Sequence, residues 1–263
     1  MNPHSTASVT HSDQGAPPSL AQRFQAMGLD WIVPKWPAPP GVQAFVTTRN
    51  GSVNSEAFLP AAPVWLEQVH GADVIVADAL CAPSCERASS TLPESASPRR
   101  PRADASVTRE ANVVLAVRAA DCLPVLFVER GGSVIGIAHA GWRGLAAGVL
   151  ENTIAVMNCR PARIVAWFGP AIGRSAFEVG ADVRDAFLHS DSGAQAAFIE
   201  GSQGKWFADL EALARMRLSR AGVTSTHGGG MCTMSDPARF FSFRRERATG
   251  RMAAFLWREG AHA

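Results

Sequence analysis

The 263-residue sequence contains no tyrosine and no apolar run long enough to cross a membrane. Uninterrupted apolar stretches such as Val113–Val117 are far shorter than the roughly 18 residues that a membrane-spanning helix needs. The polar start of the chain, MNPHSTASVTHSDQGAPPS, also lacks the apolar centre of a secretory signal. We therefore expect no membrane association and no export by that route.

Excess charge and a dense set of cysteines are absent as well. The 25 basic and 23 acidic side chains leave a formal net charge of only +2, which argues against nucleic-acid binding. The five cysteines form an odd and widely scattered set, unlike the disulfide framework of a small secreted domain. This usage is typical of the reducing cytoplasm, where we expect the protein to work. The five are Cys81, Cys85, Cys122, Cys159 and Cys232.

Two segments have low complexity. Residues 1–20 are rich in Ser, Thr, Pro and Gly and cannot repay the entropy of ordering, so they predict a disordered tail. Pro and Ser also dominate residues 81–102, which predict an exposed flexible loop. The apolar patterns on either side of this loop are short strands that need partners across it. The chain length fits one large domain, which we place at residues 21–263.

Short β-branched runs alternate with helical patterns in the rest of the chain. Residues 123–128 and 133–138 flank the turn sequence Glu-Arg-Gly-Gly and predict a β-hairpin. From Leu145 the period changes to that of a helix, which ends near Pro161. This mixture predicts an α+β fold with mixed β-sheets flanked by helices. Further strands are predicted at 42–48, 74–76, 113–117, 164–168, 240–243 and 252–257, and further helices at 182–188 and 210–218.

Three segments combine a metal-binding side chain with glycine or proline: EQVHG with His70, ADCLP with Cys122 and AHAGWRG with His139. A catalytic zinc site needs about three protein ligands and leaves its fourth position to water or substrate. Cys122 precedes the first strand of the predicted hairpin and His139 follows the second, so strand pairing brings these two together. His70 has to arrive from elsewhere, and spacing alone does not show that it does.

Other interpretations of these residues remain open at this point. A cysteine beside Leu and Pro is often only a small buried apolar side chain, and a single histidine is often a scaffold residue. Alternatively, His139 or His70 activates the Cys122 thiolate as a nucleophile, without any metal.

Candidate anion-binding residues lie near the same segments. Arg143 stands in GWRG, where a strand passes into a helix whose first N–H groups favour an anion. Arg49 and the pair Arg244 and Arg245 are further candidates for binding phosphate. The alternatives are a glycine-permitted turn for Arg143 and ordinary surface charge for the others.

Two aspartates are candidates for a supporting role. Asp121, beside Cys122, and Asp104, in RADA, could orient a ligand histidine or move protons. Either carboxylate could equally cap the end of a strand.

Together these segments resemble a known family. The blocks VWLEQVHGADV, ADASVT, VRAADCLPVLF, IGIAHAGWRGLAAGVLENT and WFGPAIGRSAFEVG, then CT and FFSFRRERATGRMA, occur in family order over about residues 42–257. The sequence is similar to the laccase-like family of purine nucleoside phosphorylases, whose members also carry the name multicopper polyphenol oxidase. The resemblance implies that the metal ligands are His70, Cys122 and His139.

The resemblance also implies an activity. It implies phosphorolysis of adenosine, inosine or guanosine, cleavage of S-methyl-5′-thioadenosine, and deamination of adenosine, with purine nucleosides and phosphate as partners. We expect Zn²⁺ as the cofactor, with Cu²⁺ as the alternative, because one three-ligand site suits hydrolysis better than oxidation by several copper centres. Copper-dependent polyphenol oxidation, and a metal- and nucleoside-binding protein with weakened turnover, are the alternatives. Oligomeric state is not predicted.

The sequence departs from the family pattern in three places. A segment with a Leu-Asn-Leu-Gly motif is missing between Gly51 and Trp65, which we expect to remove a wall of the pocket and weaken or redirect activity. Phe243 replaces the usual tyrosine. The 81–102 loop, with its incomplete Cys81-x3-Cys85 motif, looks like an insertion without a chemical role.

Overall fold

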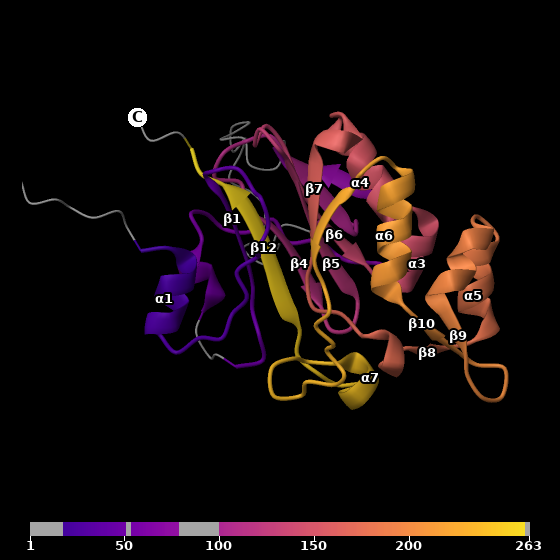
Figure 1. The fold of residues 1–263 in the computed structure, drawn as a ribbon. Helices are drawn as coiled ribbons and strands as arrows, with labels where there is room; N and C mark the ends of the chain where they lie inside the picture. The colour runs from indigo at the N-terminus through magenta and orange to yellow at the C-terminus, as the bar shows by residue number, and fades with distance from the viewer. Residues whose placement is uncertain (1–17, 51–53, 79–99, 261–263) are drawn as a thin grey trace, which may run out of the picture.

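The computed structural model describes residues 18–50, 54–78 and 100–260 and arranges them in four layers (Figure 1). A short helix, α1 (Leu20–Ala26), covers the outer face of a three-stranded sheet. The inner face of that sheet packs on a six-stranded sheet, whose far face is covered by helices. None of the helices in these ranges is long and apolar enough to cross a membrane. Most of the 81–102 loop and the tail before residue 18 lie outside the described residues.

The six-stranded sheet has the order β11-β7-β5-β6-β3-β2. Its two edge pairs are parallel and the pairs between them are antiparallel, which confirms the predicted mixed sheet. Because both faces are covered, residues of β5 and β7 are buried on both sides, as in a nearly continuous apolar run. The strands are β2 (Val74–Val76), β3 (Ala105–Thr108), β5 (Leu123–Glu129), β6 (Ile135–Ala140), β7 (Ile164–Phe168) and β11 (Ser225–Gly228).

The three-stranded sheet places the last strand of the chain between two early ones. Strand β12 (Met252–Arg258) pairs antiparallel with β1 (Val42–Val46) on one side and with β4 (Leu115–Ala119) on the other. Alternate residues of the sheet face the six-stranded sheet and the aromatic cluster under α1, which explains the period of two along β12. A small third sheet joins β8 (Glu178–Val179), β10 (Trp206–Ala208) and β9 (Phe198–Glu200).

The helical pattern after residue 141 is split into two helices. Gly148 adopts a φ of 95° between α3 (Trp142–Ala147) and α4 (Val149–Met157), a backbone conformation that favours glycine. The predicted single helix from Leu145 is therefore wrong in its continuity, although its buried face packs on the six-stranded sheet as expected. Two further helices, α5 (Ala181–Leu188) and α6 (Leu210–Arg220), agree with the predicted ones.

One predicted strand is absent from the structure. Residues 240–243 form no strand, because the Ser242 side chain accepts a hydrogen bond from Arg245 N and caps the short helix α7 (Phe243–Glu246). The aromatic content of the segment predicts a strand, but only Phe240 of its three phenylalanines is fully buried. Strands β3 and β8 to β11 were not predicted.

Candidate metal centre

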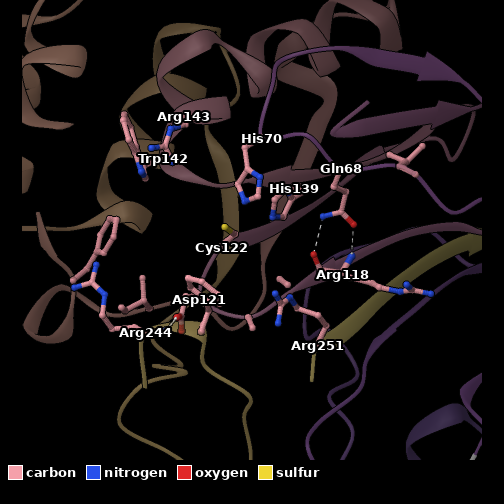
Figure 2. Close-up of a pocket in the computed structure, with 16 residues that line it drawn as sticks. Gln68, His70, Arg118, Asp121, Cys122, His139, Trp142, Arg143, Arg244 and Arg251 are labelled. Carbon is pink, nitrogen blue, oxygen red and sulfur yellow. Dashed lines mark hydrogen bonds between the residues drawn. The ribbon is translucent and has the colours of Figure 1, made fainter. Parts of the chain in front are cut away.

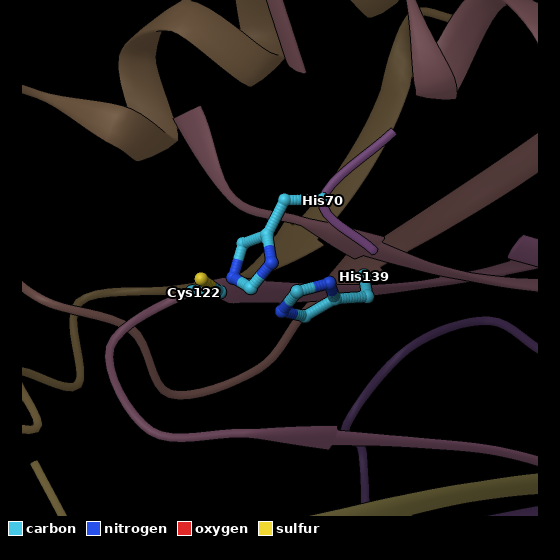
Figure 3. A group of neighbouring side chains, drawn as sticks. All are labelled: His70, Cys122 and His139. Carbon is cyan, nitrogen blue, oxygen red and sulfur yellow. The ribbon is translucent and has the colours of Figure 1, made fainter. Parts of the chain in front are cut away.

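Three side chains from three separate segments meet at one end of the six-stranded sheet (Figure 3). Cys122 directly precedes β5, His139 is the fifth residue of β6, and the register pairs His139 with Pro124. His70 comes from the loop before β2 and has a φ of 59°. The donor atoms of the three side chains all lie within 4.8 Å of one another. The predicted hairpin therefore brings Cys122 and His139 together, and the structure places His70 beside them.

Asp104 connects the two histidines. Its Oδ1 lies 2.8 Å from His139 Nδ1 and accepts a hydrogen bond from His70 N at 3.0 Å. Its Oδ2 accepts hydrogen bonds from Val69 N at 3.1 Å and from Gly71 N at 2.7 Å. The Asp104 side chain is completely buried, so this carboxylate is satisfied entirely by protein donors. It directs Nε2 of His139 toward Cys122 and fixes the unusual backbone of His70.

Two glycines allow the segments to approach closely. A Cβ on Gly141 would lie 2.9 Å from Cys122 Sγ and 3.1 Å from His70 Cδ2. A Cβ on Gly144 would lie 2.5 Å from the carbonyl oxygen of Gly71. The glycines of GWRG therefore allow close packing around the three candidate ligands. The anion site at the start of this helix stays a prediction.

The charges of this cluster depend on one another. Burial alone raises the pKa of a thiol, but hydrogen bonds from His139 and His70 lower the pKa of Cys122 to about 6. Burial lowers the pKa of His139, but its hydrogen bonds to Asp104 and Cys122 raise it to about 9. Asp104 is buried, yet the His139 side chain and the amides of the 69–71 segment lower its pKa. Cys122 and His139 therefore share one proton near neutral pH.

That shared proton predicts how metal binding depends on pH. A metal ion needs a thiolate and a neutral imidazole, so binding at pH 7 should release about one proton. Because the pKa of His139 is raised to about 9, affinity should rise about tenfold per pH unit from pH 7 toward that value and then level off. Titration calorimetry of Zn²⁺ in buffers of different ionisation enthalpy measures the protons released. Binding at pH 7 without proton release would contradict the shared proton.

The three side chains lie in the wall of a pocket of about 570 Å³ (Figure 2). Among the described residues, four arginines and two histidines line it together with one acidic residue. Apolar side chains, among them Trp142, Phe177 and Phe243, cover much of the remaining wall. The pocket therefore combines three candidate metal ligands, excess positive charge and aromatic surface. The four arginines are Arg118, Arg143, Arg244 and Arg251.

Asp121 lines the pocket, but its carboxylate is fully engaged. Oδ1 accepts a hydrogen bond from the Thr233 hydroxyl at 2.6 Å. Oδ2 accepts one from the Ser242 hydroxyl at 3.1 Å and one from Arg244 N at 2.7 Å. These bonds join two C-terminal segments to the residue beside Cys122, an arrangement typical of a structural carboxylate.

The four arginines that the sequence suggested for phosphate binding lie in different places: two line the pocket and two do not. Arg143 and Arg244 line the pocket, with their guanidinium groups over the rings of Trp142 and Phe177. Arg245 does not line it, because its guanidinium donates to the carbonyl oxygens of residues 233, 234 and 240. Arg49 faces a neighbouring cavity and pairs with Glu246 at 2.6 Å.

Sequence reasoning missed Arg118, Arg251 and Gln68. In Figure 2, Arg118 and Arg251 lie on the opposite side of Cys122 from Arg143 and Arg244. The Gln68 side chain forms two hydrogen bonds of 2.8 Å with the backbone of Arg118, one to its oxygen and one from its nitrogen. An arginine inside the apolar run of β4 was the available signal for Arg118.

One family model and several known proteins match most of the chain. A family model described as multi-copper polyphenol oxidoreductase laccase matches residues 43–259. The chain is 42% identical over 254 residues to a purine nucleoside phosphorylase of Pseudomonas aeruginosa. It is 44% identical over 254 residues to the purine nucleoside phosphorylase YfiH of Escherichia coli strain K12. Each alignment covers 86% of this chain and 98% of the relative.

Solved structures share the fold. Protein NMB0706 of Neisseria meningitidis superposes with a TM-score of 0.77 at 40% identity, covering 88% of this chain and 100% of the other. YlmD of Geobacillus stearothermophilus superposes with a TM-score of 0.67 at 27% identity, covering 84% and 93%. These matches confirm the α+β fold and the resemblance seen in the sequence. The chain belongs to the laccase-like family whose relatives are named purine nucleoside phosphorylases.

Proposed function

We propose that the protein is a zinc-dependent purine nucleoside phosphorylase that also deaminates adenosine. The observation that carries this proposal is the group of His70, Cys122 and His139 in the wall of a cationic and aromatic pocket. The names of relatives 42–44% identical to this chain support the substrate class. Adenosine, inosine, guanosine and S-methyl-5′-thioadenosine are the proposed substrates, with phosphate as the attacking group.

The chemistry of the donor set fits zinc. Two histidines and one cysteine are borderline ligands of the kind zinc accepts, and three of them leave a position open. The hydrogen bond of His139 Nδ1 to Asp104 leaves Nε2 for the metal, the usual arrangement of a ligand histidine. When bound, the metal supplies a Lewis acid that activates water for deamination.

The residues of the pocket have proposed roles in binding. Aromatic surface from Trp142, Phe177 and Phe243 provides faces on which a purine stacks. Arg143 and Arg244 hold phosphate against the anomeric carbon, where a phosphate oxygen forms the new bond as the bond to the purine nitrogen breaks. The structure leaves Asp121 little freedom for proton transfer, so we assign it to holding Arg244 in place.

Copper-dependent oxidation of phenols is the second candidate, and the description of the family model favours it. In the described ranges, one group of three candidate ligands is found, whereas multicopper oxidation uses several copper centres. The two are separated by spectroscopy of the purified protein. Cu²⁺ bound to a cysteine absorbs visible light, and Zn²⁺ does not.

The proposal is tested by metal analysis of the purified protein together with chromatography of adenosine incubated with and without phosphate. We expect stoichiometric zinc, adenine that forms only with phosphate, and some inosine. Cys122→Ala should lose the metal and at least about 100-fold in both activities, because the thiolate is one of three ligands. Cys159→Ala is the matched control, since Cys159 lies outside the pocket.

Each other result has a meaning. Bound zinc without any nucleoside product would contradict the proposed enzymatic activity. It would favour a protein that binds metal and nucleoside with weakened turnover, as the shortened 52–64 segment suggested. Activity that persists after chelation but is lost on thiol alkylation would favour a cysteine nucleophile at Cys122 instead. A protein without bound metal would remove the basis of the ligand assignment.

A further inference from the structure

A second cavity, which we call the adjoining cavity, lies beside the pocket lined by His70, Cys122 and His139, which we call the metal pocket. Its volume is about 300 Å³, at the lower end of the range for small-molecule sites of about 300–1,000 Å³. Arg118 and Arg251 line both cavities and so form their common boundary. Trp31, Trp65 and Arg49 contribute to the rest of its wall. One ligand can therefore contact both cavities at this boundary.

The guanidinium of Arg118 is held in place but not neutralised. It lies 4.1 Å from the centre of the Trp65 ring, and the Arg118 backbone is held by its two hydrogen bonds with the Gln68 side chain. Within the part of the chain that the structure describes, this guanidinium has no hydrogen bond and no ion pair. Burial and the nearby charge of Arg100 lower the pKa of Arg118, and Glu56 opposes them. A guanidinium held in place without an acidic partner favours the binding of an anion.

The other charges around the adjoining cavity do not balance Arg118. Arg49 is neutralised by Glu246, which lies outside the lining. Arg251 donates to the carbonyl oxygens of Thr249 and Gly250 and has no acidic partner among the described residues. Glu56 is the one acidic side chain of the described lining. Two arginines thus face one carboxylate.

We propose that the adjoining cavity is an oxyanion subsite in which Arg118, with Arg251, binds a phosphoryl group. Its position across the boundary suits a ligand whose nucleoside part lies in the metal pocket and whose own phosphoryl group reaches past Arg118. The phosphoryl group can belong to a nucleoside 5′-monophosphate or to free phosphate. The subsite does not depend on which reaction occurs at the metal centre.

Titration calorimetry tests the proposal on the full chain with the metal it carries when purified. The probes are inorganic phosphate, adenosine and adenosine 5′-monophosphate. The ratio of the affinity for adenosine 5′-monophosphate to the affinity for adenosine isolates the contribution of the phosphoryl group. Arg118→Gln should weaken phosphoryl binding at least about tenfold, because a charged hydrogen bond is lost. Arg118→Lys should retain part of it, since the charge remains without the planar fork.

The outcomes separate the sources of the anion. Loss of the monophosphate preference alone in Arg118→Gln assigns the subsite to nucleotides, and loss of inorganic phosphate binding assigns it to free phosphate. No change with either probe overturns the proposal, and so does an equal loss in Arg100→Gln, a neighbouring charge that lines neither cavity. Calorimetry needs no turnover, so a protein that binds these anions but converts no nucleoside would refute only the proposed function.

Discussion

Replacing Asp104 with asparagine is expected to lower zinc affinity about 10- to 100-fold and activity with it. The carboxylate accepts two hydrogen bonds at each oxygen, from His139 and His70 at one and from Val69 and Gly71 at the other. An asparagine has one acceptor oxygen, so its NH₂ group must face two donors whichever way it is turned. The His139 ring and the His70 loop both lose their orientation as a result.

The measurement is competition with a fluorescent zinc chelator, with circular dichroism to confirm that the variant is folded. Asp73→Asn is the control. Asp73 is an exposed aspartate in the loop that carries His70, and its side chain makes no hydrogen bond within the described ranges. If folded Asp104→Asn binds zinc as tightly as the parent protein, Asp104 does not position the ligands.

Gly141→Ala should damage the same centre by a different physical route. The new Cβ would lie 2.9 Å from Cys122 Sγ, closer than real Cβ contacts come, and 3.1 Å from His70 Cδ2, tighter than nine in ten of them. Gly141 has φ −68° and ψ 160°, a conformation that alanine adopts freely, so the effect is steric and falls on the ligands rather than on the backbone. We expect zinc affinity to fall at least about tenfold, because the thiolate must move.

The same chelator competition measures this loss, and turnover of adenosine should decline in parallel. Gly260→Ala serves as the control, since its Cβ would meet nothing closer than 3.4 Å. A folded Gly141→Ala protein with unchanged zinc affinity would show that the thiolate has room to adjust, and that this glycine is not required for the metal centre.

The hairpin and the metal ligands show what the sequence could predict. Turn residues between two apolar runs predicted the pairing of β5 with β6, and the structure confirms it with Leu123 opposite Ala140. That pairing by itself brings Cys122 near His139. The position of His70 could not be derived in this way, because it depends on Asp104, 34 residues further along the chain. A carboxylate bonded to backbone amides leaves no periodic signal in a sequence.

The walls of the pocket show what the sequence could not predict. Arg118 and Arg251 are adjacent only because β4 and β12 pair, and no local pattern reports a contact between strands so far apart in sequence. Arg244 and Arg245 are neighbours in sequence, but α7 turns only Arg244 toward the pocket. Arginine side chains also bind carbonyl oxygens, as Arg245 does, so their number alone overstates the anion-binding surface.

The position of β12 between β1 and β4 has a consequence for the order of assembly. All three candidate ligands have been synthesised by residue 139, but β4, which leads to Cys122, lacks its partner strand until residues 252–258 are made. A nascent chain that ends before Met252 carries every donor side chain without the completed sheet behind them. Contacts this distant in sequence form slowly. Stable metal loading should therefore wait until residues 252–258 have been added to the sheet, rather than follow directly on synthesis of the three candidate ligands.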